Sequence, residues 1–158
     1  FGHSFFDEQL LRRGIDLSRG RGDLELQKQS ISTVLNDDFV FAVPESNIKD
    51  AVKKLVKAEA SEGYCIGDDK KFIGKFSLQG LLVAPQLASL KVHLITEPVV
   101  LNHDASIAQA MEVASHFVGE TIPVINHENG QIVGVVSEGD IFGAYLTTQS
   151  RVRDLEHN

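Results

Sequence analysis

Several features that mark well-known classes of protein are scarce or missing in this chain of 158 residues. It contains a single cysteine, Cys65, which excludes a scaffold of internal disulfides and favours a reducing compartment. No apolar run approaches the ~18–20 residues that a membrane-spanning helix needs, and no signal peptide is recognisable. Tryptophan is absent, but the 42% of hydrophobic and 23% of charged residues are ordinary for a soluble globular protein. We therefore expect one well-buried core, or two small repeats that share one.

An excess of positive charge is also missing, because the net charge is −7. Binding to nucleic acid requires clustered Lys and Arg side chains that neutralise phosphates. The arginine-rich stretch over residues 12–21 is interleaved with acidic residues and is close to neutral. We therefore expect no nucleic-acid partner.

The common catalytic and phosphate-binding motifs are not present either. The chain has no G-x-S-x-G elbow, no G-x-x-x-x-G-K-[ST] loop and no G-x-G-x-x-G loop. Its six histidines show neither H-x-x-x-H nor H-x-H spacing, which argues against a metal site. Cys65 lies in an apolar stretch and is expected to be an inert core thiol. The sequence therefore predicts no catalytic residue, no metal and no enzyme activity.

What the chain does contain is an internal repeat. Residues 43–51 align with residues 102–110 at an offset of 59, and residues 72–77 align with residues 132–137 at an offset of 60. Two copies of one supersecondary unit usually pack against each other, because neither copy buries its apolar face alone. The cleft between the copies is therefore the first place to look for a function.

Each copy is predicted to consist of a strand, a helix, two further strands and a second helix, on the basis of apolar spacing and turn residues. In the first copy these elements are expected at 39–43, 47–60 with Ser46 as N-cap, 64–66, 72–76, and from Ser77 to Pro85. In the second copy they are expected at 99–101, 106–117, 122–125, 131–136 and 137–146. A helix and linker are expected over residues 1–28, and a polar, frayed tail is expected after the last helix.

The stretch 134–140 is the strongest candidate for a ligand site. Ser137 is placed to cap a helix whose free N–H groups and positive dipole end would attract an anion. The carboxylate of Asp140 could accept two hydrogen bonds from a vicinal diol such as that of a ribose. The same Ser-x-x-Asp spacing is also that of a capping box, which stabilises a helix start and binds nothing. From the residues alone, a nucleoside phosphate site and a helix cap are alternatives.

The order and duplication of these segments resemble a tandem pair of CBS domains, also called a Bateman module. The resemblance covers about residues 29–148 and rests on the closing motifs 74–77 and 134–140 and on the strand at 121–124. It implies an α/β fold of the α+β kind. Two tandem repeats of strand, helix, strand, strand and helix would pack about a pseudo-two-fold axis and leave two clefts.

The resemblance also implies a ligand, because a cleft in this family often binds an adenosine compound such as AMP, ADP or ATP. Asp140 would hold the ribose and Ser137 would lie near phosphate. The base would lie against strands of the other repeat, and the residues implied there are Val40, Gly63, Tyr64 and Ile66. Tyr64 could stack on the base or be a core aromatic.

The first repeat departs from the family pattern. Gly80 stands where the ribose-binding Asp would be, and Cys65 replaces the usual proline. The second cleft would therefore lack a diol acceptor, and at most one good nucleotide site is expected. The residues implied for that second cleft are Ser77, Val99, Ile122 and Pro123.

Residues 4–17, with the core Arg-Arg-Gly-Ile-Asp-Leu, resemble the stretch that joins the last membrane helix of a chloride channel or transporter family protein to its cytoplasmic CBS pair. The implied organisation is a linker from a membrane domain (1–28), two CBS repeats (29–91 and 92–148) and a tail (149–158). This would explain why the chain starts at Phe1 without a methionine.

The implied role is a regulatory module on the cytoplasmic side of a membrane, forming a homodimer, with the parent's membrane domain and an adenine nucleotide as partners and no cofactor. The alternatives are a ligand-free dimerisation and tethering module, or a CBS module of another transporter or of an enzyme. S-adenosylmethionine or a cyclic dinucleotide would use a similar adenosine slot.

Overall fold

The computed structural model describes residues 28–95, 97–117 and 119–157. The predicted N-terminal helix and linker up to residue 27 lie outside the described residues. The same holds for residues 4–17, which carry the resemblance to a chloride channel linker. None of the described helices combines the length and the apolar character needed to cross a lipid bilayer.

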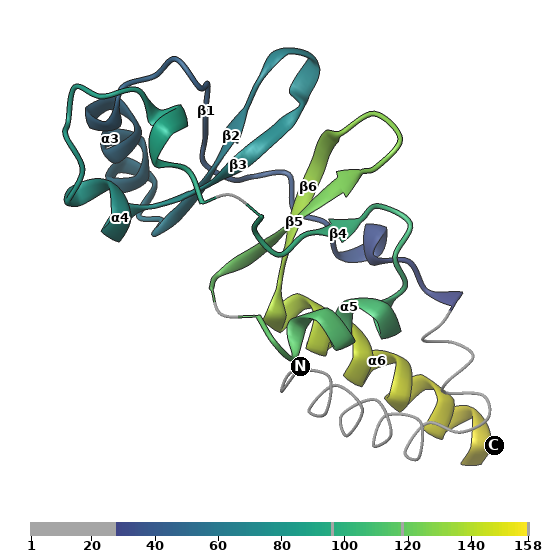
Figure 1. The fold of residues 1–158 in the computed structure, drawn as a ribbon. Coiled ribbons are helices and arrows are strands. Elements are labelled where there is room, and N and C mark those ends of the chain that lie inside the picture. The colour runs from purple at the N-terminus through teal and green to yellow at the C-terminus, as the bar shows by residue number, and fades with distance from the viewer. Residues whose placement is uncertain (1–27, 96, 118, 158) are drawn as a thin grey trace. The chain divides into compact units, whose positions relative to one another are not determined.

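The first repeat builds a three-stranded sheet in the order β1-β2-β3 (Figure 1). Its strands are β1 (Phe41–Ala42), β2 (Glu62–Ile66) and β3 (Phe72–Ser77). β1 and β2 are parallel, because a helix separates them in the chain, whereas β2 and β3 form an antiparallel hairpin. The predicted hairpin is confirmed, but the predicted strand over 39–43 is reduced to two residues.

Two helices complete the first repeat: α3 (Ile48–Ala58) and α4 (Leu78–Leu82). Short 3-10 turns lie in the hairpin, η2 (Asp68–Lys70), and after α4, η3 (Leu90–His93). The helix was predicted to begin at Ser77, and Ser77 is the N-cap of α4.

The prediction that Ser46 caps α3 is wrong. The side chain of Asn47 accepts the Asp50 N–H at 2.8 Å, and asparagine is as good an N-cap as serine. Ser46 lies one residue too early, because its own N–H donates to the Val43 carbonyl in the preceding turn.

The second repeat has the same order of elements. Its strands are β4 (Leu101–Asn102), β5 (Thr121–Asn126) and β6 (Gln131–Ser137), and its helices are α5 (Ile107–Ala114) and α6 (Glu138–His157). The sheet order is β4-β5-β6, with β4 parallel to β5. β4 begins two residues later than the predicted strand at 99–101. The predicted succession of strand, helix, strand, strand and helix is confirmed in both copies.

The prediction that the last helix ends near Leu146 in a frayed tail is wrong, because α6 continues to His157. Ile141, Ala144 and Thr148 follow one another along its buried side. The Thr148 hydroxyl also donates to the Gln29 side chain at 2.6 Å. The polar residues after Leu146 therefore belong to a helix with one anchored side.

The described part of the chain divides into two compact units. The helical unit contains η1 (Ile31–Val34), α5 and α6, and the sheet unit contains both sheets with α3, α4 and η3. Within the helical unit, α5 packs against α6, and η1 also contacts α6. Because the division within β6 falls after Val135, the units cut across the two repeats. The repeat boundaries 29–91 and 92–148 stay predictions.

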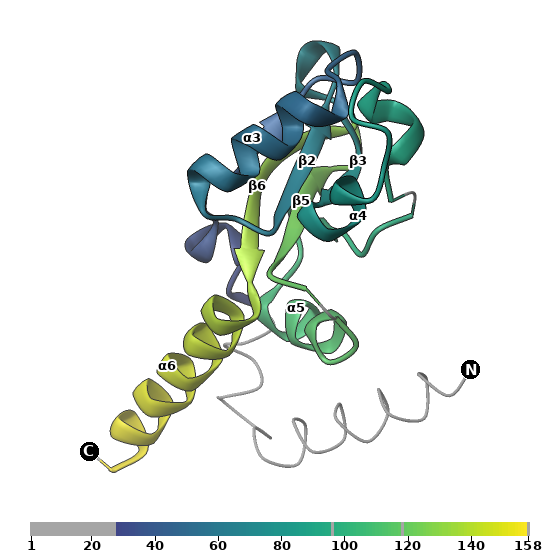
Figure 2. The same ribbon diagram turned by 90° about the vertical axis from the view of Figure 1, so that its left-hand side faces the viewer.

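In the sheet unit, α3 and α4 lie side by side and cover one face of the first sheet (Figure 2). Apolar residues spaced three and four apart on α3 face the strands, as the pattern predicts. The core between the helices and the strands consists of Ala42, Ile48, Ala51, Leu55, Cys65, Phe76, Leu81 and Leu90. All of these side chains are buried, so this cluster is the principal hydrophobic core of the first repeat.

A second core joins the two sheets within the sheet unit. Tyr64 of β2 packs with residues of β5 and β6, namely Ile125, Ile132 and Val135. Backbone hydrogen bonds also link the hairpins, because the Phe72 N–H donates to the Gly130 carbonyl at 2.9 Å. The two repeats therefore pack through their sheets, as predicted.

Candidate ligand site

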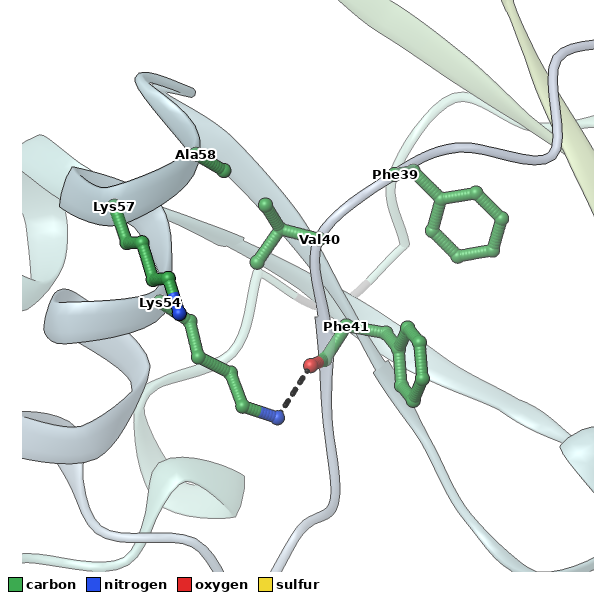
Figure 3. A pocket seen from close by; sticks show the side chains of 6 residues that line it. All are labelled: Phe39, Val40, Phe41, Lys54, Lys57 and Ala58. Atoms are coloured by element: carbon green, nitrogen blue, oxygen red, sulfur yellow. Dashed lines mark hydrogen bonds between the residues drawn. The ribbon is translucent and has the colours of Figure 1, made fainter.

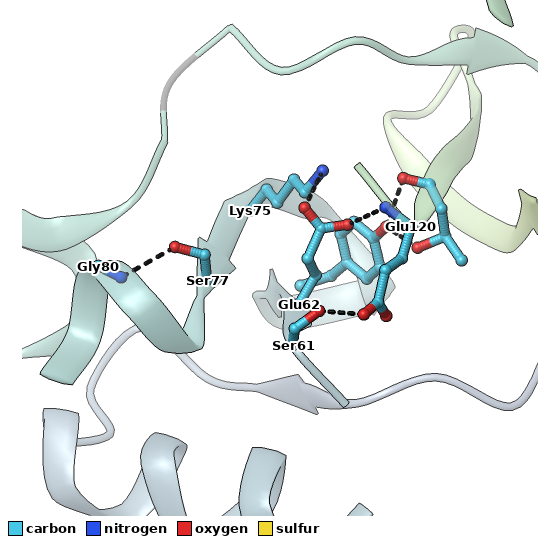
Figure 4. Close-up of polar contacts among 8 residues, drawn as sticks. Ser61, Glu62, Lys75, Ser77, Gly80 and Glu120 are labelled. Carbon is cyan, nitrogen blue, oxygen red and sulfur yellow. Dashed lines mark hydrogen bonds and ion pairs between the residues drawn. The ribbon is translucent and has the colours of Figure 1, made fainter. Parts of the chain in front are cut away.

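Ser137 caps the start of α6. The Asp140 N–H donates to Ser137 Oγ at 3.0 Å. The first repeat contains the same bond at the equivalent position, where the Gly80 N–H donates to Ser77 Oγ at 3.1 Å (Figure 4). The helix-cap interpretation of Ser137 is therefore confirmed, and Ser77 caps α4 in the same way.

The carboxylate of Asp140 does not complete a capping box. It is exposed and makes no hydrogen bond or ion pair with any residue that the structure describes. In α5, by contrast, the Gln109 side chain accepts the Ser106 N–H while Ser106 caps the helix. The two carboxylate oxygens of Asp140 are therefore available to a ligand.

The residue before Asp140 is a glycine with open space beside it. A Cβ added at Gly139 would meet nothing nearer than Ser137 Oγ at 3.8 Å. The first N–H groups of α6 lie at the same place and carry the positive end of the helix dipole. An acceptor pair for a diol and a donor group for an anion thus lie together at the start of α6.

The four site residues predicted in the first repeat lie on two opposite faces of one sheet. Val40 packs against the core under α3, and a Cβ at Gly63 would point into the same core. Tyr64 and Ile66 belong to the cluster between the two sheets. Successive residues of a strand face opposite sides, so Gly63 and Tyr64 cannot present their side chains to one face.

Tyr64 is a core residue that joins strands β2 and β5. Its side chain is 1% exposed, and its hydroxyl donates to the Thr121 carbonyl at 3.1 Å and contacts the Thr121 hydroxyl. Burial raises the pKa of the Tyr64 phenol to about 12, against a smaller lowering by the Thr121 hydrogen bond. The phenol therefore stays protonated, and its ring packs edge-on against Phe39 (5.7 Å between centroids). Of the two alternatives for Tyr64, the structure supports a core aromatic.

A polar cluster next to Tyr64 was missed by sequence reasoning (Figure 4). Lys75 Nζ lies 2.7 Å from Glu62 Oε2, with the two side chains only 7% and 14% exposed. The Glu120 N–H donates to Glu62 Oε1 at 2.8 Å, and the Ser61 hydroxyl hydrogen-bonds the Glu120 carboxylate. The single signal in the sequence is a lysine in the middle of the apolar strand 72–76. The other members of the cluster, Glu62 and Glu120, are distant from Lys75 in the sequence, so no local pattern reveals them.

The predicted six-residue site is divided between the compact units. Ser137 and Asp140 belong to the helical unit, and the four first-repeat residues belong to the sheet unit. A pocket that contains all six stays a prediction. In the second predicted cleft, Ile122 and Pro123 are buried and Val99 is exposed. Gly80 offers no carboxylate there.

Cys65 is buried, as predicted for a core thiol. Desolvation, with a smaller contribution from the charge of Glu45, raises the pKa of the Cys65 thiol to about 11, which keeps it unreactive at neutral pH. Among the described residues, no group of three or more His, Cys, Asp or Glu side chains is placed to hold a metal ion.

Gly63 is required by core packing, which gives a first testable prediction. A Cβ at this position would lie 2.6 Å from the Phe76 ring and 3.2 Å from Val40 Cγ1. Gly63→Ala is therefore expected to lower the free energy of unfolding by about 1–3 kcal/mol, measured by urea denaturation. Gly143→Ala is the matched control, because a Cβ there meets nothing within 4 Å. Equal stability of the two variants would contradict this packing role.

Comparison with known proteins agrees with this architecture. Residues 91–147 match the family model described as the CBS domain. A comparison with curated protein sequences found no match.

Solved structures of CBS domain pairs resemble the chain in fold. A CBS domain pair/ACT domain protein from Thermotoga maritima gives a TM-score of 0.68 at 15% identity, over 75% of this chain and 98% of that one. CbpB in complex with c-di-AMP gives 0.73 at 15% identity, over 85% and 95%. The cytosolic domain of the Mg²⁺ channel MgtE in complex with ATP gives 0.67 at 17% identity, over 75% of this chain and 50% of that one. The fold is therefore that of a CBS domain pair.

Proposed function

We propose that this chain is a regulatory module that binds an adenine nucleotide, and that it is not an enzyme. The observation that carries the proposal is the exposed Asp140 carboxylate, which has no partner among the described residues and lies beside the Ser137 cap. Structures of the same fold that contain ATP or c-di-AMP support an adenosine compound as the ligand class.

The roles follow from the chemistry at the start of α6. The two ribose hydroxyls would donate to the Asp140 carboxylate, which gives two charge-assisted hydrogen bonds. A phosphate oxygen would accept hydrogen bonds from the N–H groups at the helix start, near Ser137. Val40 and Ile66, which are partly exposed, are proposed to contact the adenine. Gly63 and Tyr64 are proposed to do so only through their backbone, because both side-chain positions face packed cores.

We propose further that the parent protein is a chloride channel or transporter and that the module lies on the cytoplasmic side of the membrane as a homodimer. The supporting observation is the Arg-Arg-Gly-Ile-Asp-Leu core at residues 12–17. Nucleotide binding would act on transport only through a difference in affinity between two conformations of the module.

The test is isothermal titration of the chain with ATP, ADP, AMP and c-di-AMP. Asp140→Ala is expected to weaken binding of the preferred nucleotide by at least about tenfold, because hydrogen bonds to a charged group are lost. Asp50→Ala is the matched control, since Asp50 is exposed and stands at the same place after the cap of α3. If the Asp140 variant keeps its melting temperature and still binds as tightly as the control, the assignment of Asp140 is wrong.

A second candidate function is a dimerisation and tethering module without a ligand, and the observation that favours it is Gly80, which removes the diol acceptor from the equivalent place in the first repeat. Sedimentation with and without nucleotide separates the two functions. A pure tether sediments identically in both conditions and releases no heat with any of the four nucleotides.

A further inference from the structure

Helix α3 is rich in lysine, although the chain as a whole is negatively charged. Four of the nine lysines lie within its 11 residues, although the net charge is −7. All four are exposed, and none forms an ion pair with a described residue. We call them the α3 basic face: Lys49, Lys53, Lys54 and Lys57.

The arrangement along the helix extends this charge over the whole length of α3. Lys49, Lys53 and Lys57 are spaced by four residues, which places them in one row on the side away from the buried residues Ile48 and Leu55. The row is about 12 Å long, since each residue of a helix adds about 1.5 Å. Such a row can face several separate negative charges at once.

Exposed apolar side chains lie beside the basic face. Phe41 and Val43, in and after β1, are 53% and 49% exposed, and Val56 of α3 is 59% exposed. A shallow hollow of about 420 Å³ lies between β1 and the C-terminal half of α3 (Figure 3). Its lining residues are Phe39, Val40, Phe41, Lys54, Lys57 and Ala58.

Lys54 holds this edge of the sheet in place. Its Nζ donates to the Phe41 carbonyl at 2.9 Å and lies 5.5 Å from the centre of the Phe41 ring (Figure 3). The outward carbonyl of β1 is thereby occupied, and β1 is only two residues long. A peptide could not add a strand at this edge, because strand addition needs a run of free backbone groups.

The chemistry of the surface favours a lipid bilayer over a protein. The hollow is shallow, and the cations are all lysines, which act as point charges and do not form the bidentate pairs of arginine. Lysines next to exposed aromatic and aliphatic side chains suit the headgroup region of an anionic bilayer. We propose that the α3 basic face, together with Phe41 and Val43, binds the surface of a membrane that contains anionic lipid.

The test measures binding of the whole chain to vesicles of phosphatidylcholine with about one third phosphatidylserine, compared with pure phosphatidylcholine. The triple variant Lys49→Gln/Lys53→Gln/Lys57→Gln is expected to bind the anionic vesicles about 100-fold more weakly, at roughly fivefold per lysine. Lys54 is left unchanged because it supports the Phe41 backbone. Added salt is expected to weaken binding of the natural sequence, because ions screen the attraction.

The matched control is Lys70→Gln/Lys71→Gln/Lys91→Gln, which removes the same charge from exposed lysines elsewhere in the sheet unit. It is expected to retain nearly all of the vesicle binding. Equal binding by the two triple variants, or no preference of the unaltered chain for anionic vesicles, would overturn the proposal. Binding to polyglutamate that equals vesicle binding and is lost in the α3 variant would identify an acidic polypeptide instead, and the lipid proposal would be wrong. Nucleotide is absent from every arm, so the outcome does not depend on the proposed function.

Discussion

Glu62→Ala is expected to lower the free energy of unfolding by about 3 kcal/mol, because it removes the carboxylate that holds the Lys75 ammonium in a nearly buried position. The same change deprives the Glu120 N–H of its acceptor, at the point where the chain enters β5. Urea denaturation measures the loss. Glu112→Ala, at an exposed position on α5, is expected to change stability by less than about 0.5 kcal/mol.

A double-mutant cycle separates the contribution of the Glu62–Lys75 ion pair to stability from that of simple packing. Replacing both residues, as in Glu62→Gln/Lys75→Met, leaves no unpaired charge and is expected to cost less than the sum of the two single replacements. Costs that add without any coupling would show that the ion pair does not stabilise the sheet unit.

Phe76→Ala is expected to lower the free energy of unfolding by about 3–5 kcal/mol, the second large effect. Phe76 is fully buried in the core under α3 and α4, and its ring occupies the space that the missing Cβ of Gly63 leaves open. The truncation would create a cavity that α3 cannot close without moving its own buried side chains.

The control for Phe76 is Phe142→Ala on the exposed side of α6, where truncation leaves no cavity. Its expected cost is below about 1 kcal/mol. Similar melting temperatures for the two alanine variants would show that the packing around Phe76 does not determine stability.

The helices of the sheet unit could be predicted from sequence because their apolar spacing directly reflects burial. Ile48, Ala51 and Leu55 repeat at three and four residues, and all three are buried. The cap could not be predicted to the residue, because Ser46 and Asn47 are both good N-caps. The turn that binds the Ser46 N–H to Val43 decides between them.

The length of α6 depends on contacts that the local sequence does not reveal. Residues 147–157 are mostly polar, and polarity at a chain end is typical of fraying. The partner of Thr148 is Gln29, which lies 119 residues away along the chain. A hydrogen bond of such range becomes visible only in the folded protein.

The candidate site was predictable at its helix end and less so at its strands. The Ser-x-x-Asp spacing correctly gave the Ser137 cap, and the structure adds that the Asp140 side chain makes no reciprocal bond to it. The two-residue period of strands already places Gly63 and Tyr64 on opposite faces, so the sequence contained a warning against a shared pocket. Nothing local signals the bond between Tyr64 and Thr121, which joins the two repeats.

Because α6 is one continuous helix, a small tilt at its start would produce a larger displacement at its end. Its 20 residues correspond to a rod about 30 Å long. A rotation of about 5° at the Ser137 end would move the last turn by about 3 Å, which exceeds the shifts of helices at many switching interfaces. The extra turns beyond Leu146 therefore lengthen the arm over which a tilt at Ser137 would be amplified.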